Sequence, residues 1–128
     1  MSNIIFSLTI AVMSLHFFTI TYRLNGINRC LYNIPIAIFE TSIPLLNYDE
    51  EIGLYYNKSM LEDKLTYYIN SNIVKYCHSY TMDLYYYNQV DESICLTNTC
   101  DAVEITIHAD VILLTKYSRT ARFYIKHN

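Results

Sequence analysis

Glycine is scarce in this chain, with 2 residues in 128, and tryptophan is absent. Phosphate-binding loops built from backbone amides need several glycines, because the backbone must approach the phosphate closely. The patterns G-x-S-x-G of serine hydrolases and H-E-x-x-H of zinc proteases are missing as well. We therefore expect no such loop or site, and we expect a protein that is not an enzyme and carries no cofactor.

Charged residues are also few, at 16% of the chain, whereas an average soluble domain has roughly 25%. The net charge is −3, and no long run carries one sign. A nucleic-acid-binding face needs a basic surface to meet phosphates, so we expect no nucleic-acid partner. With 52% hydrophobic residues, the chain needs a place for apolar surface other than a small core.

That place is predicted at the N-terminus, where residues 4–22 read IIFSLTIAVMSLHFFTITY without Asp, Glu, Lys or Arg. As a helix, such a run spans roughly 28 Å, close to the ~30 Å of a bilayer core. We predict a transmembrane anchor over residues 1–22. The alternatives are a buried core helix and a cleaved signal peptide. The signal peptide is disfavoured because no Lys or Arg precedes the run and no small-x-small site follows it.

Apolar residues beyond the anchor recur at offsets of 3, 4, 3 and 4, which is typical of a helix with one apolar face. The pattern predicts that the helix continues out of the bilayer, with kinks at Gly26 and Pro35. The stripe is either a face packed on the protein's own sheet or an interaction face for a partner helix. Its members are Leu24, Ile27, Leu31, Ile34 and Ile38.

A second, amphipathic helix is predicted from about residue 60 to residue 74. The tetrapeptide SMLE at residues 59–62 matches the capping box S-x-x-E, in which Ser59 would cap the helix. The acidic residues 49–51, followed by Gly53, predict a loop before this helix.

Two-residue periodicity follows and predicts strands at residues 79–88 and 102–114. A third strand is predicted at residues 122–126, with Phe123 and Ile125 pointing inward. The predicted fold class is therefore α+β, with a long N-terminal transmembrane helix, a second helix and a small antiparallel β-meander. Residues 23–128 form a single small domain in this prediction.

Cys95 and Cys100 enclose a polar turn between the two clearest strands. If the chain folds back there, their Cα atoms can approach the roughly 5.5 Å that a disulfide needs. Disulfides persist on the oxidising side of a membrane, so this pair predicts a domain outside the cytoplasm. Free thiols are the main alternative, and the state of Cys30 and Cys77 is left open.

A metal site and a catalytic pair are weaker interpretations of the same region. Zinc would have to gather Cys95 and Cys100 with more distant residues, yet no C-x-x-C knuckle is present. His108 and Asp110 share one face of the predicted strand at residues 102–114. They are mostly expected as ordinary surface residues and not as an acid/base pair.

Two features of the sequence predict opposite orientations of the chain in the membrane. Arg23 and Arg29 follow the apolar run, and the positive-inside rule would place the domain after them in the cytoplasm. The cysteine pair places it outside. Two arginines are a small bias, so we expect the domain outside the cytoplasm.

The order of these parts resembles type IV pilin-like proteins, in particular the TadE-like minor pilins. The resemblance lies in the apolar run at residues 4–22, the stripe at residues 24–38 and the loop closed by Cys95 and Cys100. It implies a structural subunit of a pilus or secretion apparatus that associates with the membrane and with other subunits through its N-terminal helix. The alternative is a soluble or membrane-associated binding module that uses the tyrosines at residues 85–87 as a contact patch.

Overall fold

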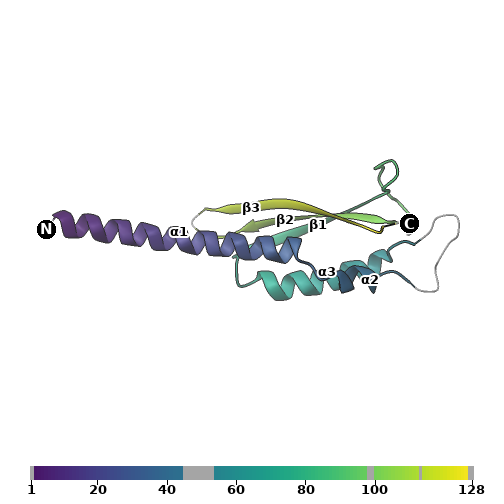
Figure 1. Ribbon diagram of the computed structural model, residues 1–128, viewed down its shortest axis with the longest axis horizontal. Helices are drawn as coiled ribbons and strands as arrows, with labels where there is room; N and C mark the ends of the chain where they lie inside the picture. Colours follow the sequence, from purple (N-terminus) through teal and green to yellow (C-terminus); the bar gives the residue numbers. More distant parts are fainter. Residues whose placement is uncertain (1, 45–53, 98–99, 113, 127–128) are drawn as a thin grey trace.

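The computed structural model describes residues 2–44, 54–97, 100–112 and 114–126 (Figure 1). The loop predicted at residues 49–53 lies outside this range. The strands form one antiparallel sheet in the order β1-β2-β3, and the fold class is α+β, as predicted. In chain order, the elements are α1 (Ser2–Tyr32), α2 (Ile36–Glu40), α3 (Lys58–Ile73), β1 (Ser79–Tyr87), β2 (Ala102–Asp110) and β3 (Lys116–Tyr124).

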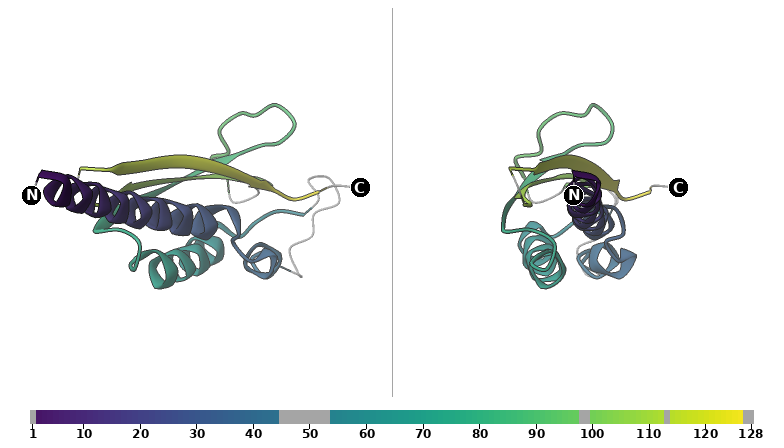
Figure 2. Two further views of the ribbon diagram at one scale, coloured as in Figure 1. Left: turned by 60° about the vertical axis from the view of Figure 1, so that its left-hand side comes forward. Right: turned by 90° about the vertical axis from the view of Figure 1, so that its left-hand side faces the viewer.

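The molecule has two layers. Figure 2 shows the sheet as one layer and the three helices together on one of its faces. The N-terminal half of α1 projects beyond the sheet, whereas its C-terminal half lies along it (Figure 1). One face of the sheet is therefore covered by helices, and the other is open.

The core lies between these layers and follows the alternation of β2. Val103, Ile105 and Ile107 are fully buried against the helices, whereas His108 on the opposite face is exposed. The central position of β2, paired with β1 and β3 along its whole length, explains why its inward side chains are inaccessible to water. From α3, the core receives four fully buried side chains at helical spacing, namely Leu61, Leu65, Ile69 and Ile73.

The apolar stripe after the anchor packs inside the chain. Ile27 and Leu31 are fully buried, and Ile34 is nearly so. Leu24 and Ile38 are partly buried against the same core. The stripe thus packs on the protein's own sheet and α3, which is the first of the two alternatives. Its buried members are not available as an interaction face for a partner helix.

The stripe also spans two helices and the connection between them instead of one helix. α1 ends at Tyr32, and Pro35 precedes the separate short helix α2. Pro35 has no N–H to donate, and its ψ of 133° is that of extended chain. The structure thereby corrects the expectation of one continuous helix kinked at Pro35. Gly26, in contrast, lies inside α1.

The N-cap of α3 lies two residues before the one that the predicted capping box would give. Asn57 is the N-cap residue, and its Oδ1 accepts a hydrogen bond from the backbone N–H of Met60 at 3.1 Å. Ser59 is already within the helix, so the prediction that it caps α3 is wrong. Asn is as effective an N-cap as Ser, which is why the two positions compete in sequence.

Two strand boundaries also differ from the prediction. β2 ends at Asp110 instead of residue 114, and β3 begins at Lys116 instead of residue 122. Between these two ends, the N–H of Val111 donates to the carbonyl of Thr115 at 2.9 Å, which reverses the chain. The inward orientation of Phe123 is confirmed, because it packs partly buried against the core. Ile125 is buried just beyond the end of β3.

Candidate functional site

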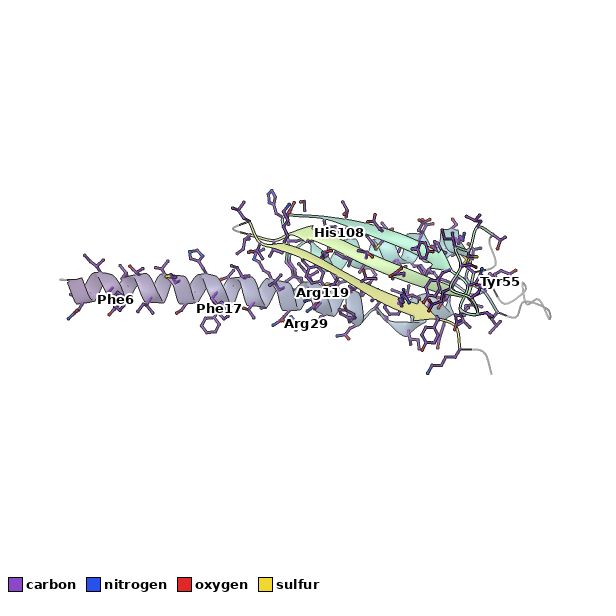
Figure 3. All side chains as sticks on the ribbon, turned by 90° about the horizontal axis from the view of Figure 1, so that it is seen from above. Phe6, Phe17, Arg29, Tyr55, His108 and Arg119 are labelled. Carbon is purple, nitrogen blue, oxygen red and sulfur yellow. A yellow bond between two sulfur atoms is a disulfide. The ribbon has the colours of Figure 1, made fainter. Side chains whose placement is uncertain are left out.

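The N-terminal half of α1 is the most unusual surface of the molecule. Every residue from 3 to 19 is exposed, although the run is mostly apolar and contains no Asp, Glu, Lys or Arg. Phe6 and Phe17 are 67% and 66% exposed, and their rings project away from the helix axis with no other part of the chain near them (Figure 3). A core helix would be wrapped by its own chain. The structure therefore excludes the buried-helix alternative within this chain.

Two polar side chains in this run bond to the backbone of their own helix. Thr9 Oγ1 donates to the carbonyl of Ile5, and Thr19 Oγ1 donates to that of Leu15, each at 2.9 Å. Such internal bonds remove the cost of placing a hydroxyl in hydrocarbon. α1 is long and apolar enough to cross a membrane.

Contact between α1 and the rest of the chain begins at Ile20 and Thr21, which are half-buried. The next residue, Tyr22, packs edge-on against Tyr76, with ring centroids 5.6 Å apart. Tyr76 lies in the connection between α3 and β1. This aromatic pair marks the level at which the exposed helix enters the domain.

Cys95 and Cys100 form a disulfide, as predicted, with Cα atoms 5.9 Å apart. The loop that they close is tied to the start of α3. The N–H of Tyr56 donates to the carbonyl of Cys100 at 2.7 Å, and Lys58 Nζ donates to the carbonyl of Cys95 at 3.0 Å. Because the loop follows the C-terminal end of β1, it lies at the end of the domain remote from the exposed helix (Figure 1).

The other two cysteines, Cys30 and Cys77, are buried free thiols. Burial raises the pKa of the Cys77 thiol, so it stays protonated and unreactive at neutral pH. In the described part of the chain, no three His, Cys, Asp or Glu side chains gather as metal ligands would. Cys77 precedes β1 and Cys95 follows it, so the length of a strand separates the ligands that the zinc interpretation required.

His108 and Asp110 have different partners on the open face of the sheet. His108 Nε2 lies 3.6 Å from Asp83 Oδ2, and its Nδ1 is 2.9 Å from Ser118 Oγ. Asp110 instead lies 3.8 Å from Lys116 Nζ. The structure does not bring His108 and Asp110 together as an acid/base pair.

The strand register brings Ser118 beside His108, and this partner was not recognised in the sequence because it lies in the part of β3 that was not predicted. His108 is 50% exposed and Asp83 is 71% exposed. Exposed ion pairs in water contribute little, typically below ~1 kcal/mol. These three residues are therefore an ordinary surface network of the sheet.

The tyrosines at residues 85–87 do not form a single exposed patch. Tyr86 points into the core side, where Lys58 Nζ lies 5.0 Å from its ring centroid. Tyr87 is buried, stacks on Tyr85 and carries Arg122 over its ring. Only Tyr85, at 40% exposed, presents much of its ring to solvent.

Several other tyrosines have defined roles within the fold. The Tyr117 hydroxyl donates to Asn28 Oδ1 at 2.6 Å, and the Tyr80 hydroxyl donates to Asn70 Oδ1 at 2.9 Å. These bonds join strands to helices across the edges of the core. Part of the tyrosine content thus serves the packing of the two layers.

The fold and the exposed helix together define the class of this protein, an α+β domain carried on a helix that is long and apolar enough to cross a membrane. Searches of protein-family models, curated proteins and solved structures found no match to this chain. Its function must therefore be inferred from its own residues.

Proposed function

We propose that this protein is a single-pass membrane protein with its α+β domain outside the cytoplasm. Its role is structural or interactive, as a pilin-like or secretion-apparatus subunit that associates with other subunits through the N-terminal half of α1. The observation that carries this proposal is the complete exposure of an apolar helical run, residues 3–19, that is continuous with a helix buried in the domain.

The continuity of α1 supports an assembly role. The helix runs from Ser2 to Tyr32 without a break, and its C-terminal half is held under the sheet by Ile27 and Leu31. No linker separates the exposed half from the domain. Packing of the exposed half against another helix would therefore fix the orientation of the whole domain, which is what a repeating or multi-subunit assembly requires.

The exposed half is also suited to helix partners in lipid. Lipid-facing helices associate through close packing and through small polar side chains, because apolar side chains gain little by leaving one apolar environment for another. Ser7 and Ser14 lie two turns apart on the exposed helix and are candidates for such contacts.

The disulfide supports a location outside the cytoplasm, because cytoplasmic thiols are kept reduced. Arg23 and Arg29 favour the opposite orientation. We give the disulfide more weight, since a loop of this length closes only where an oxidising environment maintains it.

Thiol labelling of intact cells tests this proposal. A membrane-impermeant maleimide should label the protein only after reduction, because Cys30 and Cys77 are buried and Cys95 and Cys100 are bonded. A variant with Ser at positions 95 and 100 is the matched control and should remain unlabelled. Labelling that requires cell lysis would overturn the orientation, and recovery of the protein in the soluble fraction would overturn the anchor.

A further inference from the structure

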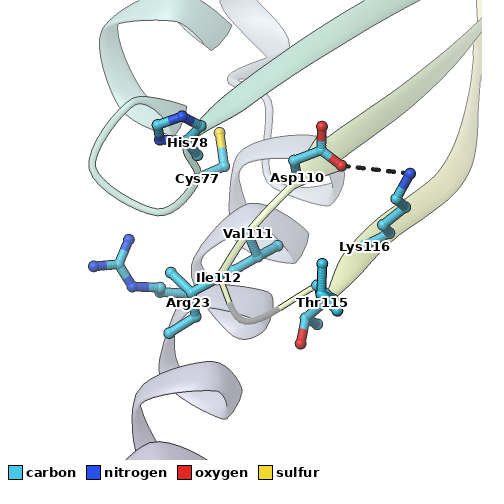
Figure 4. Close-up of a pocket in the computed structure, with 9 residues that line it drawn as sticks. Arg23, Cys77, His78, Asp110, Val111, Ile112, Thr115 and Lys116 are labelled. Atoms are coloured by element: carbon cyan, nitrogen blue, oxygen red, sulfur yellow. Dashed lines mark ion pairs between the residues drawn. The ribbon is translucent and has the colours of Figure 1, made fainter.

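A cavity of about 680 Å³ lies at the end of the domain that faces the exposed half of α1. Its walls come from α1, from the connection between α3 and β1, and from the turn between β2 and β3 (Figure 4). Arg23, His78 and Lys116 contribute positive or hydrogen-bonding groups to these walls, and Ile112 and Leu114 contribute apolar ones.

The charges around this cavity favour an anion. Arg23 and Lys116 are basic residues, and Asp110 is the one carboxylate among the lining residues. Asp110 is already engaged, because its Oδ1 lies 3.8 Å from Lys116 Nζ and its Oδ2 accepts a hydrogen bond from Ser79. Within the described residues, the side chains of Arg23 and His78 have no ion-pair or hydrogen-bond partner. Both can bind a ligand without breaking an existing interaction.

The turn beside this cavity presents an apolar side chain to its surroundings. Leu114 is 100% exposed and has a φ of 64°, in the left-handed region that disfavours side chains larger than glycine. Ile112, also in the turn, is half-buried. In water, the exposed Leu114 side chain gains no free energy that compensates for this unfavourable backbone conformation. Burial of the side chain in hydrocarbon would be favourable, because it would remove apolar surface from water.

The position of the cavity along α1 indicates which region of a bilayer it would face. α1 is bare up to residue 19 and becomes covered at Ile20, and the turn between β2 and β3 lies alongside the helix on that side of the domain (Figure 1). If residues 4–22 span a bilayer, the cavity lies at the level of the lipid headgroups. Tyr22 and Tyr76 lie at the same level, where aromatic side chains are favoured.

We propose that this cavity binds the phosphate of an anionic phospholipid headgroup, with Arg23 and His78 beside the phosphate and Leu114 inserted among the acyl chains. The proposal depends on the proposed function, because it requires the domain to lie on the bilayer. A guanidinium can bind two phosphate oxygens at once, which makes Arg23 the central residue. The adjoining apolar turn favours a lipid over free phosphate, which has no acyl chains for Leu114 to contact.

Lipid retention by the full-length protein tests this inference. The protein is purified in detergent with equal amounts of phosphatidylglycerol and phosphatidylcholine, and bound lipid is measured by native mass spectrometry. The wild type should retain phosphatidylglycerol in preference. The variant Arg23→Gln/His78→Gln should reduce this retention by about tenfold or more, since it removes hydrogen bonds to a charged group. Leu114→Ser should reduce it as well.

Arg29→Gln is the matched control, because it removes an equal charge from an exposed position of the same helix outside this cavity. It should retain lipid as the wild type does. Equal retention of the two lipids, retention unchanged in Arg23→Gln/His78→Gln, or full displacement of the lipid by inorganic phosphate would overturn the inference. Membrane recovery is measured on the same preparations. A protein that is recovered in the membrane without a lipid preference therefore contradicts this inference and leaves the proposed anchor intact.

Discussion

Gly26 of α1 packs directly against the aromatic ring of Tyr76, so closely that a Cβ atom at position 26 would overlap the ring. This contact lies one turn beyond Tyr22, whose ring also packs on Tyr76. It brings α1 against the connection between α3 and β1 at the end of the domain where the exposed helix begins. A residue that is unfavourable in a helix interior is therefore needed here for a close approach.

Gly26→Ala should destabilise the domain, although Ala is the better helix former by about 1 kcal/mol. The added methyl group would have to displace the Tyr76 ring, and overpacking of this kind costs roughly 1–3 kcal/mol. The measurement is urea unfolding of the detergent-solubilised protein, followed by circular dichroism. Asn25→Ala, at the exposed neighbouring position, is the control and should leave stability unchanged or slightly higher.

A double variant separates steric overlap from other effects. If the Tyr76 ring is the cause, Gly26→Ala should be much less harmful when Tyr76 is also replaced by Ala. Equal costs of Gly26→Ala in the two backgrounds would show that the overlap with Tyr76 does not determine its effect.

Reduction of the disulfide should lower the free energy of unfolding by about 2 kcal/mol, the amount expected for closing so short a loop. The loop also receives hydrogen bonds from Tyr56 and Lys58, so its opening should disturb the start of α3 first. Urea unfolding with and without dithiothreitol measures the difference. The variant Cys95→Ser/Cys100→Ser should have the same free energy of unfolding as the reduced wild type, and dithiothreitol should not change it. If dithiothreitol does not change the stability of the wild type either, the expectation is contradicted.

The parts that sequence predicted well are those in which local pattern and tertiary position agree. β2 alternates because one of its faces packs on the helices and the other is open to solvent, and Cys95 and Cys100 are near in both sequence and space. The start of β3 was not predicted, because local pattern and tertiary position disagree there. Ser118 and Thr120 face the open side, and Arg119 occupies a core-side position from which it reaches solvent. That stretch therefore has no apolar alternation.

The cavity beside Arg23 could not be predicted for a different physical reason. Its lining residues come from three segments that only the folded topology brings together. Leu114 also belongs to an apolar run that reads as a continued strand, whereas the chain turns there with a positive φ. A sequence pattern records which residues are apolar but not which of them a turn will expose.

Replacement of Tyr117 tests the hydrogen bond between sheet and α1. Tyr117→Phe removes the bond that its hydroxyl donates to Asn28 and should cost about 1 kcal/mol at neutral pH. Thermal or urea unfolding measures this loss. Tyr124→Phe, on the same strand but 54% exposed, is the control and should have little effect.

The contribution of Tyr117 should also be visible in the pH dependence of stability. Burial raises the pKa of Tyr117 from 10.0 to about 12. The folded state therefore holds its proton more tightly than the unfolded state, so the stabilisation is complete below pH 10 and is lost as pH rises toward 12. Tyr86 shifts in the same direction, also to about 12, through its burial. Unfolding free energies across this range should fall less steeply in Tyr117→Phe than in the wild type, and equal slopes would contradict the assignment.

A charge in the middle of the exposed helix tests the membrane anchor itself. Val12 lies near the centre of the run at residues 4–22, where an Asp would cost roughly 2.5–3.5 kcal/mol of insertion free energy. Val12→Asp should therefore shift the protein from the carbonate-resistant membrane fraction toward the soluble or aggregated fraction. Asn3→Asp places the same charge just before the run, where it can remain in the headgroup region, and should leave the distribution unchanged. If both variants partition as the wild type does, residues 4–22 do not determine the location of the protein, and the exposed half of α1 must then be covered by a protein partner in water.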